Sequence, residues 1–222
     1  MPMDTRANGP INLLIVDDHR LMLDGTATLL KNHFPLGIIQ TAQSVLEARD
    51  LIQQRPPDLL LIDLCLPERW GDEATITAGL EFLQDLMGQY PDLNLTVQSS
   101  NLKALIRILP DLESHHGGLT LVDKSSSPEE LLRKVDWAIN GITHTKEIQG
   151  NLEFRSEWLH VLHLAFEQGL QDKAIAREMN RSERTIRHYW SKIQDALSIY
   201  PESEHNMRAL TQIRAREVGL ID

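Results

Sequence analysis

Short apolar runs alternate with helical patterns along the first two thirds of the chain. The runs "INLLIV", "DLLLID", "LNLTVQ" and "GLTLV" are nearly uninterrupted, and a weaker run lies near "GIIQTA". A near-continuous apolar run indicates a strand that is buried on both faces, as in a parallel sheet whose connections are helices. The pattern therefore predicts an α/β fold, with a doubly wound five-stranded parallel sheet over residues 11–140.

Capping signals mark two of the helices between these strands. Ser44 followed by Glu47 forms a capping box at the start of "SVLEARDLIQQ". Ser127 and Pro128 open "SPEELLRKVDWAING", and Gly141 closes it. Both segments are therefore predicted to be helices that cover the sheet.

The remainder of the chain has a different pattern. Residues 141–152, "GITHTKEIQGNL", are polar with a glycine near each end, which predicts a linker. Residues 153–222 contain only helical patterns. A short one, "QDKAIAREMN", is followed after a tight turn by a longer basic one that begins at Ser182. This arrangement predicts a small all-α domain with a helix-turn-helix.

Charge separates the two parts further. The net charge is −10, which argues against a general nucleic-acid coat protein. Residues 1–150 hold 12 basic and 21 acidic side chains (−9), and residues 151–222 hold 10 and 11 (−1). Between Lys173 and Lys192 six basic residues face two acidic ones, a local charge of +4. An acidic part joined to a part with a basic patch indicates two different roles.

The composition indicates where in the cell the protein is expected to work. The chain has no apolar run long enough for a membrane span, and its N-terminus lacks the layout of a secretory signal. Cys65 is the only cysteine, which excludes an internal disulfide framework and a cysteine-rich zinc site. We therefore expect a cytoplasmic protein without a membrane partner.

Polar side chains follow four of the predicted strands where each strand ends. They are Asp17 and Asp18, Asp63, Ser99 and Lys124. The carboxyl ends of parallel strands meet at one edge of a sheet, so these side chains should converge. Three neighbouring carboxylates repel one another unless a cation intervenes, and Mg²⁺ prefers such oxygen ligands. Asp63 at the centre is suited to act as a nucleophile towards a phosphoryl group.

The joint spacing of "VDDH…LLIDLCLP…TVQSS…LVDK" resembles the receiver domain of bacterial response regulators, which has a flavodoxin-like fold, over residues 11–140. This resemblance implies that a sensor histidine kinase phosphorylates Asp63. It also implies that Asp17, Asp18 and Asp63 hold Mg²⁺, with the backbone carbonyl of Cys65. Ser99 would bond the phosphoryl group and Lys124 would pair with it.

Three features depart from the usual receiver pattern. "ERWGDEATITA" lengthens the segment that follows Pro67, and the stretch from Ser99 to Lys124 is also longer, with Pro110 interrupting a helix. Leu121 stands where receivers often carry the Tyr or Phe that moves with the Ser or Thr on phosphorylation. These departures leave the residues of the pocket in place. They argue against the usual response to phosphorylation, in which an aromatic side chain moves with the Ser or Thr.

The C-terminal part resembles the LuxR-type helix-turn-helix of the NarL/FixJ family over about residues 153–216, through "QGLQDKAIAREMN" and "SERTIRHYWSKI". In such a motif the second helix enters the major groove. Ile186, Trp190 and Ile193 share an apolar stripe that is expected to pack in the core. Arg187 and His188 are expected to contact base edges, and Ser191 a base edge or a phosphate. The expected phosphate contacts are Lys173, Arg177, Arg184 and Lys192.

These observations predict a non-enzymatic transcription regulator that binds paired DNA half-sites as a homodimer. Two alternatives remain open: a regulator that binds DNA irrespective of phosphorylation, and a signalling adaptor whose helices bind protein. An aspartate-nucleophile phosphatase ranks last, because such enzymes usually have a second Asp two residues after the nucleophile, where this chain has Cys65.

Overall fold

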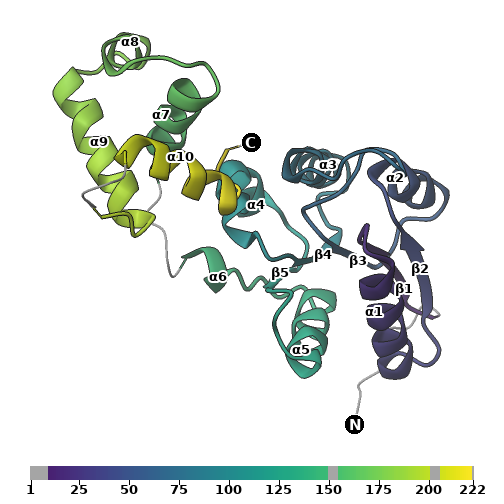
Figure 1. Cartoon of the computed structure of the whole chain (residues 1–222). Helices are drawn as coiled ribbons and strands as arrows, with labels where there is room; N and C mark the ends of the chain where they lie inside the picture. Colours follow the sequence, from purple (N-terminus) through teal and green to yellow (C-terminus); the bar gives the residue numbers. More distant parts are fainter. Residues whose placement is uncertain (1–9, 150–154, 201–205, 222) are drawn as a thin grey trace. The chain divides into compact units, whose positions relative to one another are not determined.

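A computed structural model describes residues 10–149, 155–200 and 206–221 (Figure 1). The chain divides into two compact units. The sheet unit comprises Met1–Ser100 and Pro110–Thr145, and the helical unit comprises Asn101–Leu109 and Lys146–Asp222. This division differs from the predicted boundaries at residues 101–109, which group with the helices, and at 141–145, which group with the sheet.

The sheet unit is built on a five-stranded parallel sheet in the order β2-β1-β3-β4-β5. This is the flavodoxin-like order, so the predicted fold class is confirmed. The strands are β1 (Asn12–Val16), β2 (Ile38–Ala42), β3 (Leu59–Ile62), β4 (Asn94–Gln98) and β5 (Leu119–Val122).

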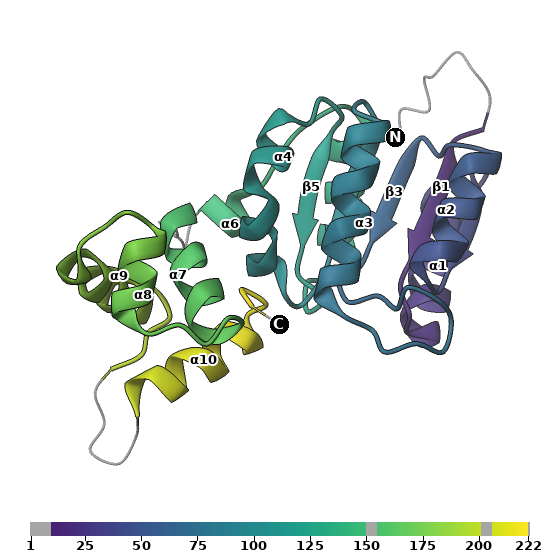
Figure 2. The same ribbon diagram turned by 90° about the horizontal axis from the view of Figure 1, so that it is seen from above.

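Helices cover both faces of this sheet (Figures 1 and 2). On one face, α1 and α5 bury Leu23, Leu30 and Val135 against the strand residues Leu13 and Leu61. On the other, Arg49 of α2 pairs with Asp85 of α3 at 2.6 Å. The bounds are α1 (Arg20–His33), α2 (Val45–Gln54), α3 (Ile76–Gln89), α4 (Leu109–Ser114) and α5 (Pro128–Ile139).

The predicted helix starts are confirmed. The Ser44 hydroxyl accepts a hydrogen bond from the N–H of Glu47 at 3.3 Å, and Ser127 accepts one from Glu130 at 3.3 Å. The Glu47 carboxylate accepts from the N–H of Gln43 at 2.8 Å, one residue earlier than in a standard capping box.

The first part of the predicted linker is attached to the sheet. The N–H of His144 donates to the carbonyl of Leu119 at 2.7 Å, and His144 forms a parallel bridge with Thr120 of β5. Lys134 of α5 lies 2.7 Å from the His144 ring, between Nζ and Nδ1. These contacts explain why residues 141–145 belong to the sheet unit.

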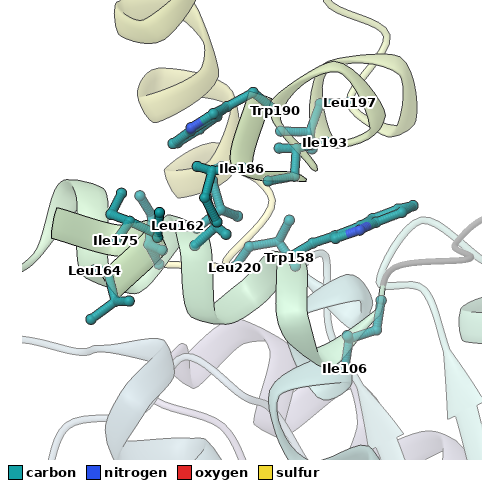
Figure 3. Close-up of a cluster of buried hydrophobic side chains, with 14 residues drawn as sticks. Ile106, Trp158, Leu162, Leu164, Ile175, Ile186, Trp190, Ile193, Leu197 and Leu220 are labelled. Atoms are coloured by element: carbon teal, nitrogen blue, oxygen red, sulfur yellow. The ribbon is translucent and has the colours of Figure 1, made fainter. Parts of the chain in front are cut away.

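The helical unit packs around one hydrophobic cluster, which includes Trp158, Leu162, Ile175, Ile186 and Trp190 (Figure 3). A helix-turn-helix is present as predicted. It is formed by α8 (Asp172–Glu178) and α9 (Glu183–Ala196). The other elements of the helical unit are the 3₁₀ helix η1 (Leu102–Ile108) and the α-helices α6 (Lys146–Gln149), α7 (Ser156–Phe166) and α10 (Met207–Glu217).

Over the described parts of the chain, no helix has the length and apolar character needed to cross a membrane.

Candidate functional site

The register of the sheet brings the predicted polar residues to one edge. Val16 pairs with Ile62, Ile62 with Val97, and Val97 with Leu121. Asp17 and Asp63 follow directly after two residues of this row, so their carboxylates lie side by side. The convergence therefore results from strand pairing rather than from loop conformation.

Lys124 joins two of these carboxylates. Its Nζ lies 2.7 Å from Asp17 Oδ2 and 2.7 Å from Asp63 Oδ2. Partial burial lowers the pKa of Lys124, but hydrogen bonds and charges from Asp17 and Asp63 outweigh burial and raise this pKa above its ordinary value. The ammonium is therefore held charged between the two acids.

Asp63 is fixed on both of its oxygens. While Oδ2 accepts from Lys124, Oδ1 accepts from the N–H of Leu64 at 2.7 Å, and the residue is only 3% exposed. Asp17 is 5% exposed, and its Oδ1 accepts from the N–H of His19 at 2.9 Å. Both carboxylates are thus oriented by their surroundings.

A group with metal-ligand spacing lies at the same edge. Atoms of Asp17, Asp18 and His19 lie within 4.8 Å of one another, with His19 Nδ1 2.6 Å from Asp18 Oδ1. Three carboxylates (those of Asp17, Asp18 and Asp63) against one ammonium leave two negative charges, which a dication with oxygen ligands would balance. The donor set therefore fits Mg²⁺. Sequence reasoning overlooked His19, although the quoted motif "VDDH" contains it.

Cys65 lies beside the pocket without the properties of a reactive thiol. Burial raises the pKa of the Cys65 thiol, and the nearby carboxylates of Asp63 and Asp18 raise it further. The sulfur therefore stays protonated at neutral pH, and it is a poor nucleophile and a poor metal ligand.

The two remaining receiver positions are buried. Ser99 is 1% exposed, and its N–H donates to the carbonyl of Val122 at 3.0 Å. Leu121 is 0% exposed in β5. The position expected to hold a mobile aromatic ring is thus filled by a core aliphatic side chain.

The insert after Pro67 is an ordered loop. Leu66 and Thr75 pair in antiparallel fashion and close its base, and Gly71 adopts a positive φ of 95°. The carbonyls of Pro67 and Glu68 accept hydrogen bonds at 3.0 Å from the first turn of α2, which fixes the loop to that helix.

A second candidate surface lies on the helix-turn-helix. Ser182 caps α9 by accepting from the N–H of Thr185 at 3.1 Å, and Asn180 in the preceding turn has a φ of 51°. Ile186, Trp190 and Ile193 are buried, as the pattern predicted. Every predicted DNA contact is exposed: Lys173, Arg177, Arg184, Arg187, His188, Ser191 and Lys192.

Side chains from α8 and α10 hold α9 in place. Asp172 of α8 accepts a hydrogen bond from Trp190 Nε1 at 3.1 Å and also pairs with Arg208 of α10. The Arg208 guanidinium lies over the Trp190 ring, 3.5 Å from its centroid. This network was not predicted, because it depends on tertiary placement of residues far apart in the sequence.

Comparison with known proteins decides the family. The profile of the response regulator receiver domain matches residues 13–136, more than half of the chain. This chain belongs to the response regulator family. The resemblance predicted for it is confirmed, and the regulator is of the NarL/FixJ type.

Similar regulators match nearly the whole chain. The transcriptional regulatory protein LnrK of Bacillus subtilis is 26% identical over 203 residues, which cover 85% of this chain and 91% of LnrK. The DNA-binding transcriptional activator DevR/DosR of Mycobacterium tuberculosis is 24% identical over 221 residues, 94% of this chain and 98% of DevR/DosR. The structure of two RcsB dimers bound to two parallel DNAs shares the fold, with a TM-score of 0.65 at 18% identity, over 94% of this chain and 98% of that one.

Proposed function

We propose that this response regulator is a transcription regulator that accepts a phosphoryl group on Asp63 from a sensor histidine kinase. The observation that carries the proposal is the position of Lys124 Nζ, 2.7 Å from both Asp17 and Asp63, within a family whose receiver profile matches this chain.

The chemistry of acceptance follows from the pocket. A carboxylate oxygen of Asp63 forms a bond to phosphorus, and the bond from phosphorus to the donor nitrogen breaks. Lys124 balances charge on the phosphoryl oxygens, and the Ser99 hydroxyl donates a hydrogen bond to one of them. Asp63 accepts the phosphoryl group once and the protein does not turn over a substrate, so we do not propose that it is an enzyme.

Asp17, Asp18 and Asp63, with the backbone carbonyl of Cys65, would hold Mg²⁺ in this proposal. When bound, the ion supplies positive charge that neutralises the phosphoryl oxygens. The buried state of Asp17 and Asp63 keeps water from screening these interactions.

The helical unit is proposed to bind DNA. The relatives named as transcription regulators support this role, and so does the exposed basic face of α9. Arg187, His188 and Ser191 would read base edges, and Lys173, Arg177, Arg184 and Lys192 would contact phosphates. We further propose a cytoplasmic homodimer on paired half-sites, since dimerisation doubles the phosphate contacts of a small basic surface.

The DNA role is tested with a duplex selected from a random pool by the wild-type protein. Arg187→Ala is expected to weaken binding to the selected duplex by about 1–3 kcal/mol and to make the protein less selective for the base that Arg187 contacts. Lys173→Ala is expected to weaken binding to all duplexes equally. It should also reduce by about one the slope of log affinity against log salt concentration. Arg214→Ala, on the exposed face of α10, is the matched control. If DNA binding depends neither on the salt concentration nor on Arg187, the result supports the adaptor alternative.

A second candidate function rests on Leu121. This position holds a buried aliphatic residue in place of a mobile ring, which favours DNA binding that is independent of phosphorylation. Affinity for the selected duplex is therefore compared with and without acetyl phosphate and Mg²⁺, and in Asp63→Asn. Equal affinity in all three cases favours this alternative over the phosphorylation-controlled regulator.

A further inference from the structure

We propose that Gln43, in the turn between β2 and α2, is a positioning residue for the dication site, because it holds the loop of Asp18 in the arrangement that binds Mg²⁺. This inference rests on the proposed function and concerns how tightly the phosphorylation pocket binds its ion. Gln43 acts through Asp18 and is not itself a ligand.

Asp18 is the acid of the pocket that depends on contacts other than Lys124. Lys124 Nζ pairs with Asp17 and Asp63, whose side chains are 7% and 4% exposed. The side chain of Asp18 is 23% exposed, and its carboxylate lies 2.6 Å from the ring of His19, the next residue along the same loop. Because His19 moves together with this loop, a fixed position of Asp18 requires a contact from another element.

Gln43 supplies such a contact from the neighbouring connection. Its Nε2 donates to the backbone carbonyl of Asp18 at 3.2 Å, and the N–H of Asp17 donates to the carbonyl of Ala42 at 3.2 Å. Strand β2 lies beside β1, so the turn that follows β2 runs next to the loop that follows β1 (Figure 1). The two hydrogen bonds join these segments before and after the peptide bond between Asp17 and Asp18.

Gln43 is itself fixed to the start of α2. Its N–H donates to the Glu47 carboxylate at 2.8 Å, and the N–H of Glu47 donates to the Ser44 hydroxyl at 3.3 Å. The side chain of Gln43 therefore reaches Asp18 from a backbone that is held by a capped helix, as a residue that orients a binding site requires.

The same turn also holds the loop that follows Asp63. The N–H of Val45 donates at 3.0 Å to the carbonyl of Pro67, two residues after Cys65, whose carbonyl is a proposed ligand. Gln43 and Val45 thus connect one turn to both loops that carry the proposed ligands. Ligands from two loops bind an ion more tightly when the loops are already held at the right separation, because binding does not then have to order them.

The test measures dication affinity directly with Mn²⁺, which shares the preference of Mg²⁺ for oxygen ligands and is quantified by electron paramagnetic resonance. Gln43→Met keeps the length of the side chain and removes the hydrogen-bond donor. Gln53→Met makes the same change at an exposed position on α2 and is the matched control. Asp18→Asn reports whether Mn²⁺ binds at the proposed site.

Gln43→Met is expected to weaken Mn²⁺ binding about tenfold, the lower end of the loss that follows removal of a residue that orients a metal ligand. Gln53→Met should bind Mn²⁺ as the wild type does. Phosphorylation by acetyl phosphate should be slow in Gln43→Met at low Mg²⁺ and should approach the wild-type rate at saturating Mg²⁺, since Asp63 and Lys124 are retained. A general disturbance of the pocket would instead slow the reaction at every Mg²⁺ concentration.

The proposal is overturned if Gln43→Met binds Mn²⁺ within about twofold of the wild type, well below the loss expected for such a residue. It is also overturned if saturating Mg²⁺ fails to restore the rate of this variant. If the wild type binds no Mn²⁺, or if Asp18→Asn binds it as tightly as the wild type, the dication site of the proposed function is wrong and the role of Gln43 fails with it.

Discussion

Lys124 stabilises the pocket by pairing with two buried carboxylates that would otherwise repel each other. Because the pKa of Lys124 is raised, its ammonium form contributes stability that is present below the ordinary lysine value of 10.5 and is lost as the pH rises through the higher folded value. Lys124 therefore remains a positive charge in the pocket over the physiological range.

His115 has the opposite behaviour and gives a prediction on pH. Burial lowers the pKa of His115, and its Nδ1 is buried without a hydrogen-bond partner, while Nε2 lies 2.7 Å from the carbonyl of Leu93. The unfolded chain takes up a proton more readily, so His115 should reduce stability as the pH falls below about 6.5. Chemical denaturation between about pH 7.5 and 5.5 should show a smaller loss of stability in His115→Asn than in the wild type. An identical loss in both proteins would contradict this assignment.

Gly79 gives a prediction on packing beside the pocket. A Cβ atom there would lie 1.9 Å from the carbonyl oxygen of Leu64, the residue whose N–H orients Asp63. Gly79→Ala should therefore force α3 outward and destabilise the protein by about 1–3 kcal/mol. It should also slow phosphorylation by acetyl phosphate.

Gly88 of the same helix is the matched control, because a Cβ there meets nothing within 4 Å. Gly88→Ala should stabilise the protein by about 0.5–1 kcal/mol through helix propensity, as measured by urea unfolding. Equal effects of the two substitutions would show that the close approach to Leu64 is unimportant.

At the level of elements, the network of Asp172, Trp190 and Arg208 joins α8, α9 and α10. Arg208→Ala removes an ion pair and a cation–π contact, so it should destabilise the helical unit by about 1–2 kcal/mol and weaken DNA binding indirectly. Arg214→Ala removes only an exposed pair with Glu217 and should cost less than about 0.5 kcal/mol. Thermal unfolding followed at the tryptophan fluorescence separates the two, and a larger effect at Arg214 would contradict this account.

The elements that the sequence predicted well have strong local signals. Four of the five strands come from nearly uninterrupted apolar runs. Ser44, Ser127 and Ser182 mark helix starts by hydrogen bonds within three residues. Parallel pairing then places strand-terminal acids together without further information. The convergence of Asp17, Asp63 and Lys124 could therefore be predicted from sequence.

The elements that escaped prediction depend on distant partners. Residues 101–109 have a helical composition, yet nothing local indicates that Ile106 packs with Trp158. The attachment of His144 to β5 and the position of Arg208 over Trp190 have the same origin. His19 has a local signal, because it directly follows Asp18 in the sequence, but its Nδ1 approaches Asp18 Oδ1 only in the folded loop after β1.

At the scale of the whole molecule, opposite charge characters accompany the two proposed roles. The acidic sheet unit would gather a dication and a phosphoryl group, and the exposed basic side chains of α8 and α9 suit a polyanion.

The central claim, that Asp63 accepts a phosphoryl group in a pocket that needs a dication, is tested most directly by intact-protein mass spectrometry after incubation with acetyl phosphate and Mg²⁺. The wild type and Asp85→Asn, which changes an exposed aspartate on α3, should each gain one phosphoryl group. Asp63→Asn, and the wild type in the presence of a chelator, should gain none. A phosphoryl group on Asp63→Asn, or none on the wild type with Mg²⁺, would contradict the claim.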